Sequence, residues 1–463
     1  MSKEFRKEKD VLGEINVPSD VYWGVNTQRA IQNFQISDKR FPKIFILALA
    51  EVKKACLLAN LELGLIEKQK GEALLQAIKE ILEENKYFDQ FPIDIFQTGS
   101  GTQTNMNMNE VLANRANQIL GFPMGKKHPI HPNDHVNKGQ SSNDVIPTTM
   151  HLSTQHSLNN KLNPAIEKLI DALEKKINEF EGIVKVGRTH LQDAVPIPLA
   201  LEFKVYLQQI KINEQRLKQA FEELCFIPIG GTALGTGINT HEKFAPIVAE
   251  KLSKITGFQI KVNPIKAEGI ASHNSIAYVS SSLRLLALSL IKMANDIRWM
   301  GSGPRAGLAE LILPANEPGS SIMPGKINPT QSEALIQVCL QVIGNDSTIS
   351  NSEAFGSILD LNVCKPVMIY NLLESINILT GGINSFIDKC LIGLKPNLEQ
   401  INAHLERMLM IVTNLNQYIG YDKCSEIAQK AYKEGKTIKE VITELGLEFE
   451  EDLDKLLDPK KMM

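Results

Sequence analysis

The chain has 463 residues, of which 43% are apolar and 22% are charged, and its formal net charge is −3. A chain of this length buries about three quarters of its unfolded surface, so it requires no disulfide or metal for stability. At about 150 residues per domain, the length suggests three domains. The composition excludes disordered and collagen-like chains, and the charge disfavours a nucleic-acid-binding face, which is usually basic.

The N-terminal part of the chain carries no targeting or membrane signal. The first ten residues mix acidic with basic side chains and lead into no apolar segment. The longest apolar run, Ile44–Ala50, is much shorter than the ~20 residues of a membrane helix. The six cysteines form no CxxC pair or Cys/His cluster, so the sequence indicates no metal site. Their scattered positions indicate a reducing compartment. We therefore expect a cytoplasmic protein without a membrane span.

Helical periodicity dominates the middle of the chain. Apolar residues recur there every three or four positions, which predicts long helices with buried stripes. The clearest helix, Asn274–Met300, would be about 40 Å long. The other long helices are predicted at Pro164–Glu181, Leu199–Leu224, Gln331–Ile349 and Pro366–Leu391. Strand signals are confined to Ile93–Phe96 and Glu181–Val186, and without alternating strands and helices a Rossmann fold is not expected.

Clusters of glycine and proline divide the chain. The break near residues 137–140 and the Gly-Leu-Lys-Pro turn at 393–396 predict three domains. These are a mixed, mainly helical domain at 1–139, a central bundle of long helices at 140–396 and a small helical domain at 397–463. The long helices carry apolar residues beyond one stripe, so we expect a homo-oligomer with large interfaces. The alternative is one large monomeric bundle.

Four loops concentrate hydroxyl, amide and glycine residues, which is unusual for a purely structural bundle. They lie at residues 98–107, 140–144, 187–193 and 319–329. The first precedes a helix expected to begin near Asn107, and the second precedes another helix. Amide groups at helix N-termini attract anions, so these loops could bind carboxylates. Each could also be an ordinary capped turn, because serine and glycine are common turn residues.

Two further features have both a chemical and a plain interpretation. His190 could act as an acid or a base, although a solitary histidine is more often structural. The glycine cluster at 230–237 lacks the Gly-Lys-Ser/Thr ending of a phosphate loop, so we interpret it as a tight crossover between helices.

Taken together, the polar segments resemble the fumarase/aspartase superfamily. Gly319–Asn328 is similar to its signature, Gly-Ser-x-x-Met-x-x-Lys-x-Asn. Within the superfamily, the motifs are most similar to those of the class II fumarases. The similar segments are Gln97–Asn107, His131–Asp134, Gln140–Asp144 and Asn316–Ser320. Further matches at 17–29, 414–415 and 419–423 extend the resemblance over nearly the whole chain.

The resemblance implies a mostly α, three-domain fumarase/aspartase-like fold with a long central helical bundle. It also implies a homotetramer whose active sites combine residues from three subunits. The implied activity is that of a metal-independent hydro-lyase of the tricarboxylic acid cycle, which adds water reversibly to fumarate in the anti sense and gives (S)-malate. No cofactor, nucleic acid or membrane partner is implied. The alternative is aspartate ammonia-lyase or another lyase of the superfamily, and a non-catalytic member is disfavoured because the site residues are retained.

The resemblance also implies roles for individual residues. Ser320 is the base that takes the carbon-bound proton, and His190 protonates the departing hydroxyl. Glu333 pairs with His190, or is only a favourable charge at a helix N-terminus. The implied substrate contacts are Ser100, Gly101, Thr102, Ser141, Ser142, Asn143, Thr189, Ser321, Lys326 and Asn328. A second, peripheral dicarboxylate site is implied at His131, Pro132, Asn133 and Asp134.

Overall fold

The computed structural model describes residues 4–462, and the chain divides into two compact units. Unit 1 comprises Met1–Pro164, Glu214–Leu285 and Leu340–Thr380, and unit 2 comprises Ala165–Asn213, Leu286–Cys339 and Gly381–Met463. The long helices α7 (Leu199–Leu224), α10 (Asn274–Met300), α11 (Thr330–Gly356) and α12 (Lys365–Phe386) contribute residues to both units. The division into three domains at 139 and 396 is a different one, and it remains a prediction.

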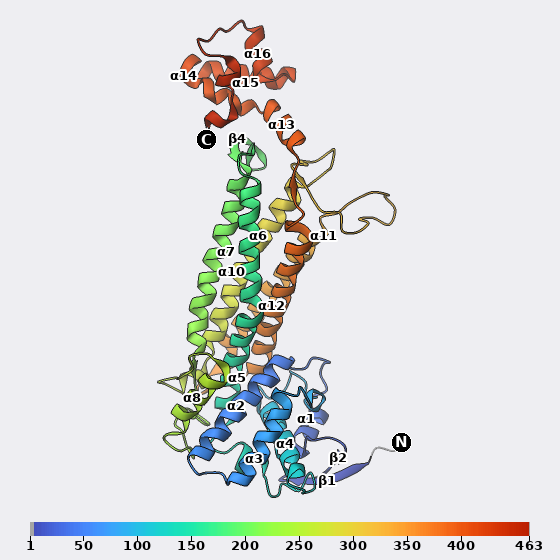
Figure 1. The fold of residues 1–463 in the computed structure, drawn as a ribbon, viewed down its shortest axis with the longest axis vertical. Helices are drawn as coiled ribbons and strands as arrows, with labels where there is room; N and C mark the ends of the chain where they lie inside the picture. The colour runs from blue at the N-terminus through green and yellow to red at the C-terminus, as the bar shows by residue number, and fades with distance from the viewer. Residues whose placement is uncertain (1–3, 463) are drawn as a thin grey trace. The chain divides into compact units, whose positions relative to one another are not determined.

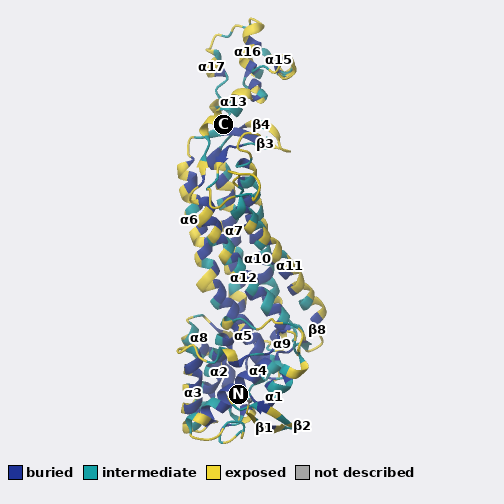
Figure 2. Ribbon diagram, turned by 90° about the vertical axis from the view of Figure 1, so that its right-hand side faces the viewer, coloured by how far each residue is buried: buried dark blue, intermediate teal, exposed yellow. Residues whose placement is uncertain are grey.

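Unit 1 is a helical unit in which α2 packs against α3, α5 and α8, and α4 packs against α1 and α3 (Figure 1). Its helices are α1 (Val25–Asn33), α2 (Lys43–Glu62), α3 (Lys68–Leu82), η1 (Phe88–Gln90), α4 (Thr102–Ile119), η2 (Pro132–Val136), α5 (Ser142–Ser157), η3 (Leu158–Leu162), α8 (Phe244–Thr256) and α9 (Glu268–Ala271). Its strands are β1 (Phe5–Asp10), β2 (Gly13–Pro18), β5 (Phe226–Ile227), β6 (Lys261–Val262), β8 (Ser357–Ile358) and β9 (Leu361–Asn362). Nearly every residue of α5 is buried (Figure 2), so the loop before it is attached to a rigid core.

Unit 2 combines helical segments with the hairpin β3–β4 and a small C-terminal group of helices. The hairpin consists of β3 (Val184–Thr189) and β4 (Gln192–Pro198), which pair antiparallel. The remaining elements are α6 (Asn163–Glu179), β7 (Leu311–Ile312), η4 (Ile387–Leu391), β10 (Lys395–Pro396), α13 (Leu398–Arg407), η5 (Leu409–Leu415), α14 (Asn416–Ile419), α15 (Tyr421–Glu434), α16 (Ile438–Glu444), α17 (Leu453–Leu456) and η6 (Pro459–Met462). Val186 of β3 belongs to the apolar core of these C-terminal helices, which therefore hold the base of the hairpin.

The predicted long helices are confirmed. Helices α7 and α10 have the predicted bounds, α11 continues beyond Ile349 to Gly356, and α12 passes into the π-helical turn η4. The apolar stripe of α10 is fully buried, at Ile276, Val279, Leu283, Leu286, Leu290, Met293 and Ile297. By length and composition alone α10 could also cross a membrane, but half of its most apolar stretch is buried within the protein, as in a core helix.

One of the two predicted strands is present in the structure and the other is not. Glu181–Val186 overlaps β3, which begins at Val184. Ile93–Phe96 is not a strand: the buried carboxylate of Asp94 accepts hydrogen bonds from the Phe96 amide and the Ser37 hydroxyl, and this closes a loop instead. Two isoleucines flanking Asp94 are buried in that loop, which explains the misleading alternation.

The expected start of a helix near Asn107 is wrong, because α4 begins at Thr102. Gly101 has a φ of 74°, a left-handed conformation that glycine adopts easily and that turns the chain directly into the helix. The side-chain oxygen of Gln97 accepts hydrogen bonds from the amide and hydroxyl of Thr104 and thereby stabilises the first turn. The hydroxyl residues are therefore part of the helix N-terminus and do not merely precede it.

Candidate functional site

A chain of hydroxyl groups links two helix N-termini in unit 1. Ser100 Oγ lies 2.7 Å from Thr102 Oγ1, which lies 2.8 Å from Ser142 Oγ. Thr102 is the first residue of α4 and Ser142 is the first residue of α5. Both helix dipoles therefore present their positive ends beside the same hydroxyls, an arrangement that favours a carboxylate.

The N-terminus of α5 is held by a reciprocal cap. Ser141 Oγ accepts a hydrogen bond from the Asn143 amide at 3.1 Å, and the Asp144 carboxylate accepts one from the Ser141 amide at 2.9 Å. The other oxygen of Asp144 accepts the amides of Gly230 and Thr232 at 3.0 and 2.9 Å. Burial raises the pKa of Asp144 to about 7. The glycine cluster thus supports the loop before α5, in agreement with its interpretation as a crossover.

His131 forms the cap of the short helix η2. Its Nδ1 accepts hydrogen bonds from the amides of Asn133 and Asp134 at 3.2 and 3.3 Å. The neutral ring therefore carries its proton on Nε2, where it can be donated to an anion. Pro132 is buried, whereas Asn133 and Asp134 are exposed. The four residues of the predicted peripheral site thus form one turn.

Ser320 lies in the long segment between α10 and α11 in unit 2. Its Oγ accepts hydrogen bonds from the amides of Ile322 and Met323 at 3.3 and 3.0 Å. The amide of Gly319 donates to the carbonyl of Lys326 at 2.7 Å and closes the loop. A Cβ at Gly319 would lie 2.5 Å from that carbonyl oxygen, so only glycine fits. The serine oxygen is therefore surrounded by donors that would stabilise a negative charge on it.

Most of this loop is open to solvent in the single chain. Residues 321–327 are exposed, and the side chain of Ile322 is 84% accessible. In the single chain the loop around Ser320 is therefore uncovered.

His190 lies at the tip of the β3–β4 hairpin and is exposed. His190 and Leu191 have φ values of 57° and 59°, which are uncommon for residues other than glycine. The hairpin is tied down just before the tip, because Arg188 Nη1 donates to Glu310 Oε1 at 2.7 Å. The fully buried Glu310 is also paired with Lys185 at 3.2 Å. These buried ion pairs hold the strained tip in place.

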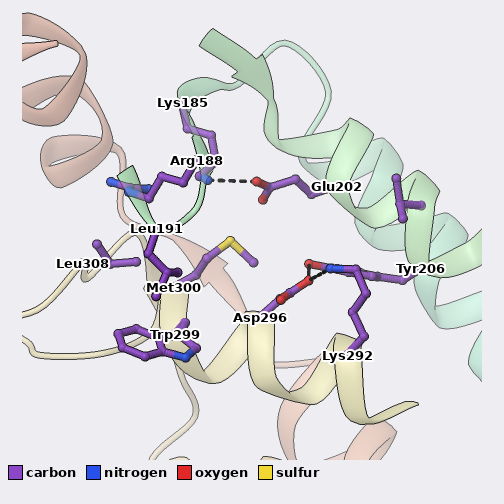
Figure 3. A pocket seen from close by; sticks show the side chains of 11 residues that line it. Lys185, Arg188, Leu191, Glu202, Tyr206, Lys292, Asp296, Trp299, Met300 and Leu308 are labelled. Atoms are coloured by element: carbon purple, nitrogen blue, oxygen red, sulfur yellow. Dashed lines mark hydrogen bonds and ion pairs between the residues drawn. The ribbon is translucent and has the colours of Figure 1, made fainter. Parts of the chain in front are cut away.

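A pocket of about 220 Å³ lies beside this hairpin (Figure 3). Lys185 is paired with Glu202 across it at 3.0 Å, and the hydroxyl of Tyr206 donates to Asp296 at 3.0 Å. Burial raises the pKa of Glu202. The charged groups of the pocket pair with one another, so they connect the hairpin to α7 and α10. Sequence reasoning missed them because they come from separate segments without a shared motif.

The predicted catalytic residues of unit 2 are not joined by hydrogen bonds or ion pairs within residues 4–462. Glu333 lies in the first turn of α11 and is half-buried. Within residues 4–462, no hydrogen bond or ion pair joins His190 to Glu333 or Ser320 to Lys326. Asn328 donates its side-chain amide to the carbonyl of Gly319 at 2.5 Å, and Thr189 and Ser321 are exposed. The same residues contain no cluster of three or more histidine, cysteine or acidic side chains suited to a metal ion.

Comparison with known proteins gives consistent matches over the whole chain. Residues 13–344 match the family described as Lyase, and residues 411–463 match the family described as Fumarase C C-terminus. The class II fumarate hydratase of Thermosynechococcus vestitus is 49% identical over 457 residues, 98% of this chain and 97% of that protein. That of Campylobacter jejuni is 47% identical over 460 residues, 99% of each chain. The crystal structure of class II fumarase from Schistosoma mansoni superposes with a TM-score of 0.95 at 38% identity, covering 99% of each chain.

Proposed function

Because this chain belongs to the class II fumarase family, we propose that it catalyses the reversible anti addition of water to fumarate, giving (S)-malate. The observation that carries the proposal is the hydroxyl chain from Ser100 through Thr102 to Ser142, across the N-termini of α4 and α5. Two helix dipoles and three hydroxyls suit one carboxylate of a small dianion. We assign Gly101, Ser141 and Asn143 to the same carboxylate, as their positions around these hydroxyls support.

The difficult step in the dehydration direction is the removal of a proton from carbon next to a carboxylate. The electron pair left behind spreads onto that carboxylate, so catalysis depends on fixed donors around it. We assign this role to Lys326 and Asn328, with contributions from Thr189 and Ser321. We assign the base to Ser320, whose oxygen already accepts two amide hydrogen bonds. These donors and the nearby Lys326 charge lower the cost of the alkoxide.

We assign the leaving-group step to His190. As the carbon–oxygen bond breaks, the protonated imidazole ring gives its extra proton to the departing hydroxyl, which leaves as water, and Ser320 keeps the proton from carbon. In hydration the two transfers run backwards. Glu333 would pair with the other ring nitrogen of His190 and determine its tautomer. The exposed position of His190 at a hairpin tip supports a partner on another copy of the chain.

We propose a homotetramer in which three subunits complete each active site. Two observations support it: the loop of Ser320 is uncovered in one chain, and the long helices expose apolar side chains. These include Leu201 on α7, Leu288 on α10 and Leu340 on α11, which are 45, 47 and 57% exposed. Such side chains typically lie in obligate interfaces. We place the enzyme in the cytoplasm, without a nucleic-acid or membrane partner, and its six free cysteines suit a reducing compartment.

The test of the proposed function is an absorbance assay in the fumarate band with malate as the only substrate. Fumarate is expected to form at the same rate with and without a strong chelator, because the serine base and histidine acid supply the proton transfers. Aspartate as the only substrate is the control and is expected to give no fumarate. Activity with aspartate but not with malate would contradict the proposal and favour an ammonia-lyase, and loss of activity with the chelator would contradict metal independence.

A second prediction concerns the peripheral turn. His131→Asn keeps a side-chain oxygen to cap η2 but removes the Nε2 proton. Calorimetric titration with malate is expected to show about tenfold weaker binding at a second class of sites, the usual effect of losing a hydrogen bond to a charged group, while turnover stays within about twofold. Unchanged affinity at every site would exclude an anion-binding role for His131.

A further inference from the structure

Among residues 4–462, the buried amine of Lys53 has no carboxylate partner. It projects from the middle of α2 and is 1% exposed. Within residues 4–462, no acidic group lies within ion-pair distance of its Nζ. Burial lowers its pKa to about 7, although Coulombic interactions with Cys56 and Asp144 oppose this shift. Burying an amine of this kind costs free energy, which only well-placed hydrogen bonds can offset.

The hydrogen bonds of Lys53 converge on the turn before α5. Its Nζ donates to Asn137 Oδ1 at 3.0 Å and to Gln140 Oε1 at 2.9 Å. The same oxygen of Asn137 accepts the side-chain amides of Asn105 and Asn109 of α4 at 3.1 and 3.2 Å. An amide oxygen has two lone pairs, so three donors exceed its normal capacity. Lys53 and α4 thus jointly fix the position of Asn137.

This turn leads directly into the proposed carboxylate site. The side-chain amide of Asn137 donates to the backbone carbonyl of Gln140 at 3.1 Å. The backbone amide of Gln140 donates to the backbone carbonyl of Asn137 at 3.0 Å. Gln140 Nε2 also donates to the carbonyl of Val136, the last residue of η2. Gln140 immediately precedes Ser141, the cap of α5. The segment held by Lys53 therefore connects the His131 turn with the N-terminus of α5.

We infer that Lys53 is a positioning residue for the dicarboxylate site, acting through Asn137 and Gln140 on the loop Ser141–Asn143. The inference rests on the proposed function, because it assigns that loop to the substrate carboxylate. Lys53 fixes the backbone from which Ser142 presents its hydroxyl. In its protonated form Lys53 also adds positive potential behind the N-terminus of α5, where low polarity weakens screening.

The experiment compares Lys53→Met and Lys53→Gln with the wild-type enzyme, using malate as the substrate. Lys53→Met removes both the charge and the donor, whereas Lys53→Gln keeps a donor. The KM of Lys53→Met is expected to rise about tenfold with kcat within about threefold, because the loop binds ground and transition states alike. Lys53→Gln is expected to give a smaller rise. A merely structural lysine would lower Tm and apparent kcat and leave KM unchanged.

Lys176→Met is the matched control. Lys176 is another buried lysine, on α6, and its Nζ donates to Glu179 and to the carbonyl of Leu394, which both belong to unit 2. Its KM is expected to match the wild type even if its Tm falls. If Lys53→Met does not fold, Gln140→Ala replaces it as the test. This substitution removes the Oε1 acceptor of Lys53 from a half-buried position and is also expected to raise KM.

The outcomes separate the two proposals. A wild-type enzyme that does not convert malate overturns the proposed function. An active wild type with KM unchanged within twofold in Lys53→Met, or in Gln140→Ala where the former does not fold, overturns the role of Lys53. A KM rise of equal size in Lys176→Met would also overturn it, because the loss of any buried lysine would then suffice.

Discussion

Ser320→Ala is expected to lower turnover of malate by about 10³-fold, within the range of roughly 10²–10⁴ for loss of a general base. The alanine methyl group cannot accept the proton from carbon, although the amides of Ile322 and Met323 remain in place. KM is expected to change little, because the carboxylates are bound by other side chains. Steady-state kinetics in both directions measure the effect, and both directions must fall equally because the overall equilibrium is unchanged.

Ser350→Ala is the control for this prediction. Ser350 is an exposed serine on α11 outside the loop, so its removal is expected to leave turnover within about twofold. A Ser320→Ala enzyme with more than a tenth of wild-type turnover would show that another group takes the proton. If the variant loses both activity and quaternary structure, its turnover is calculated for the assembled fraction, which size-exclusion chromatography measures.

His190→Asn is expected to lower turnover by roughly 10²–10⁴-fold, because asparagine can hydrogen-bond to the leaving hydroxyl but cannot protonate it. Asparagine tolerates the left-handed backbone of this position, so the hairpin tip keeps its shape. The measurement is kcat with malate and with fumarate. Binding of a non-reacting dicarboxylate is expected to stay near the wild-type affinity.

His241→Asn, at an exposed histidine in the loop before α8, is the matched control and is expected to retain full turnover. Unchanged turnover in His190→Asn would reject the assignment of the acid. Equal losses in the two histidine variants would show that the effect is not specific to the hairpin.

The long helices could be predicted from sequence because burial imposes a strict spacing on them. The stripe from Ile276 to Ile297 leaves no alternative period, and α10 has the predicted bounds. Short segments carry no such redundancy. Ile93–Phe96 alternates like a strand, yet the side chain of Asp94 closes a loop there, and four residues cannot distinguish the two outcomes.

The site was predicted from motifs, and its local geometry follows from features that a motif does not contain. The left-handed Gly101 places Thr102 inside α4 and within 2.8 Å of Ser142, a contact between residues 40 positions apart. Lys53 could not be recognised, since one lysine in an apolar helix resembles any surface lysine until its burial is known. The predicted pairing of His190 with Glu333 stays a prediction, because it would form between copies of the chain.

The uncovered loop around Ser320 also bears on how readily a single chain is cleaved by proteases. A solitary chain presents Ile322 and its neighbours as an accessible surface loop, and such loops are preferred sites of proteolytic cleavage. In the proposed assembly the same segment is shielded by another copy. If the proposed assembly forms, an unassembled chain is expected to be cleaved at this loop faster than an assembled one.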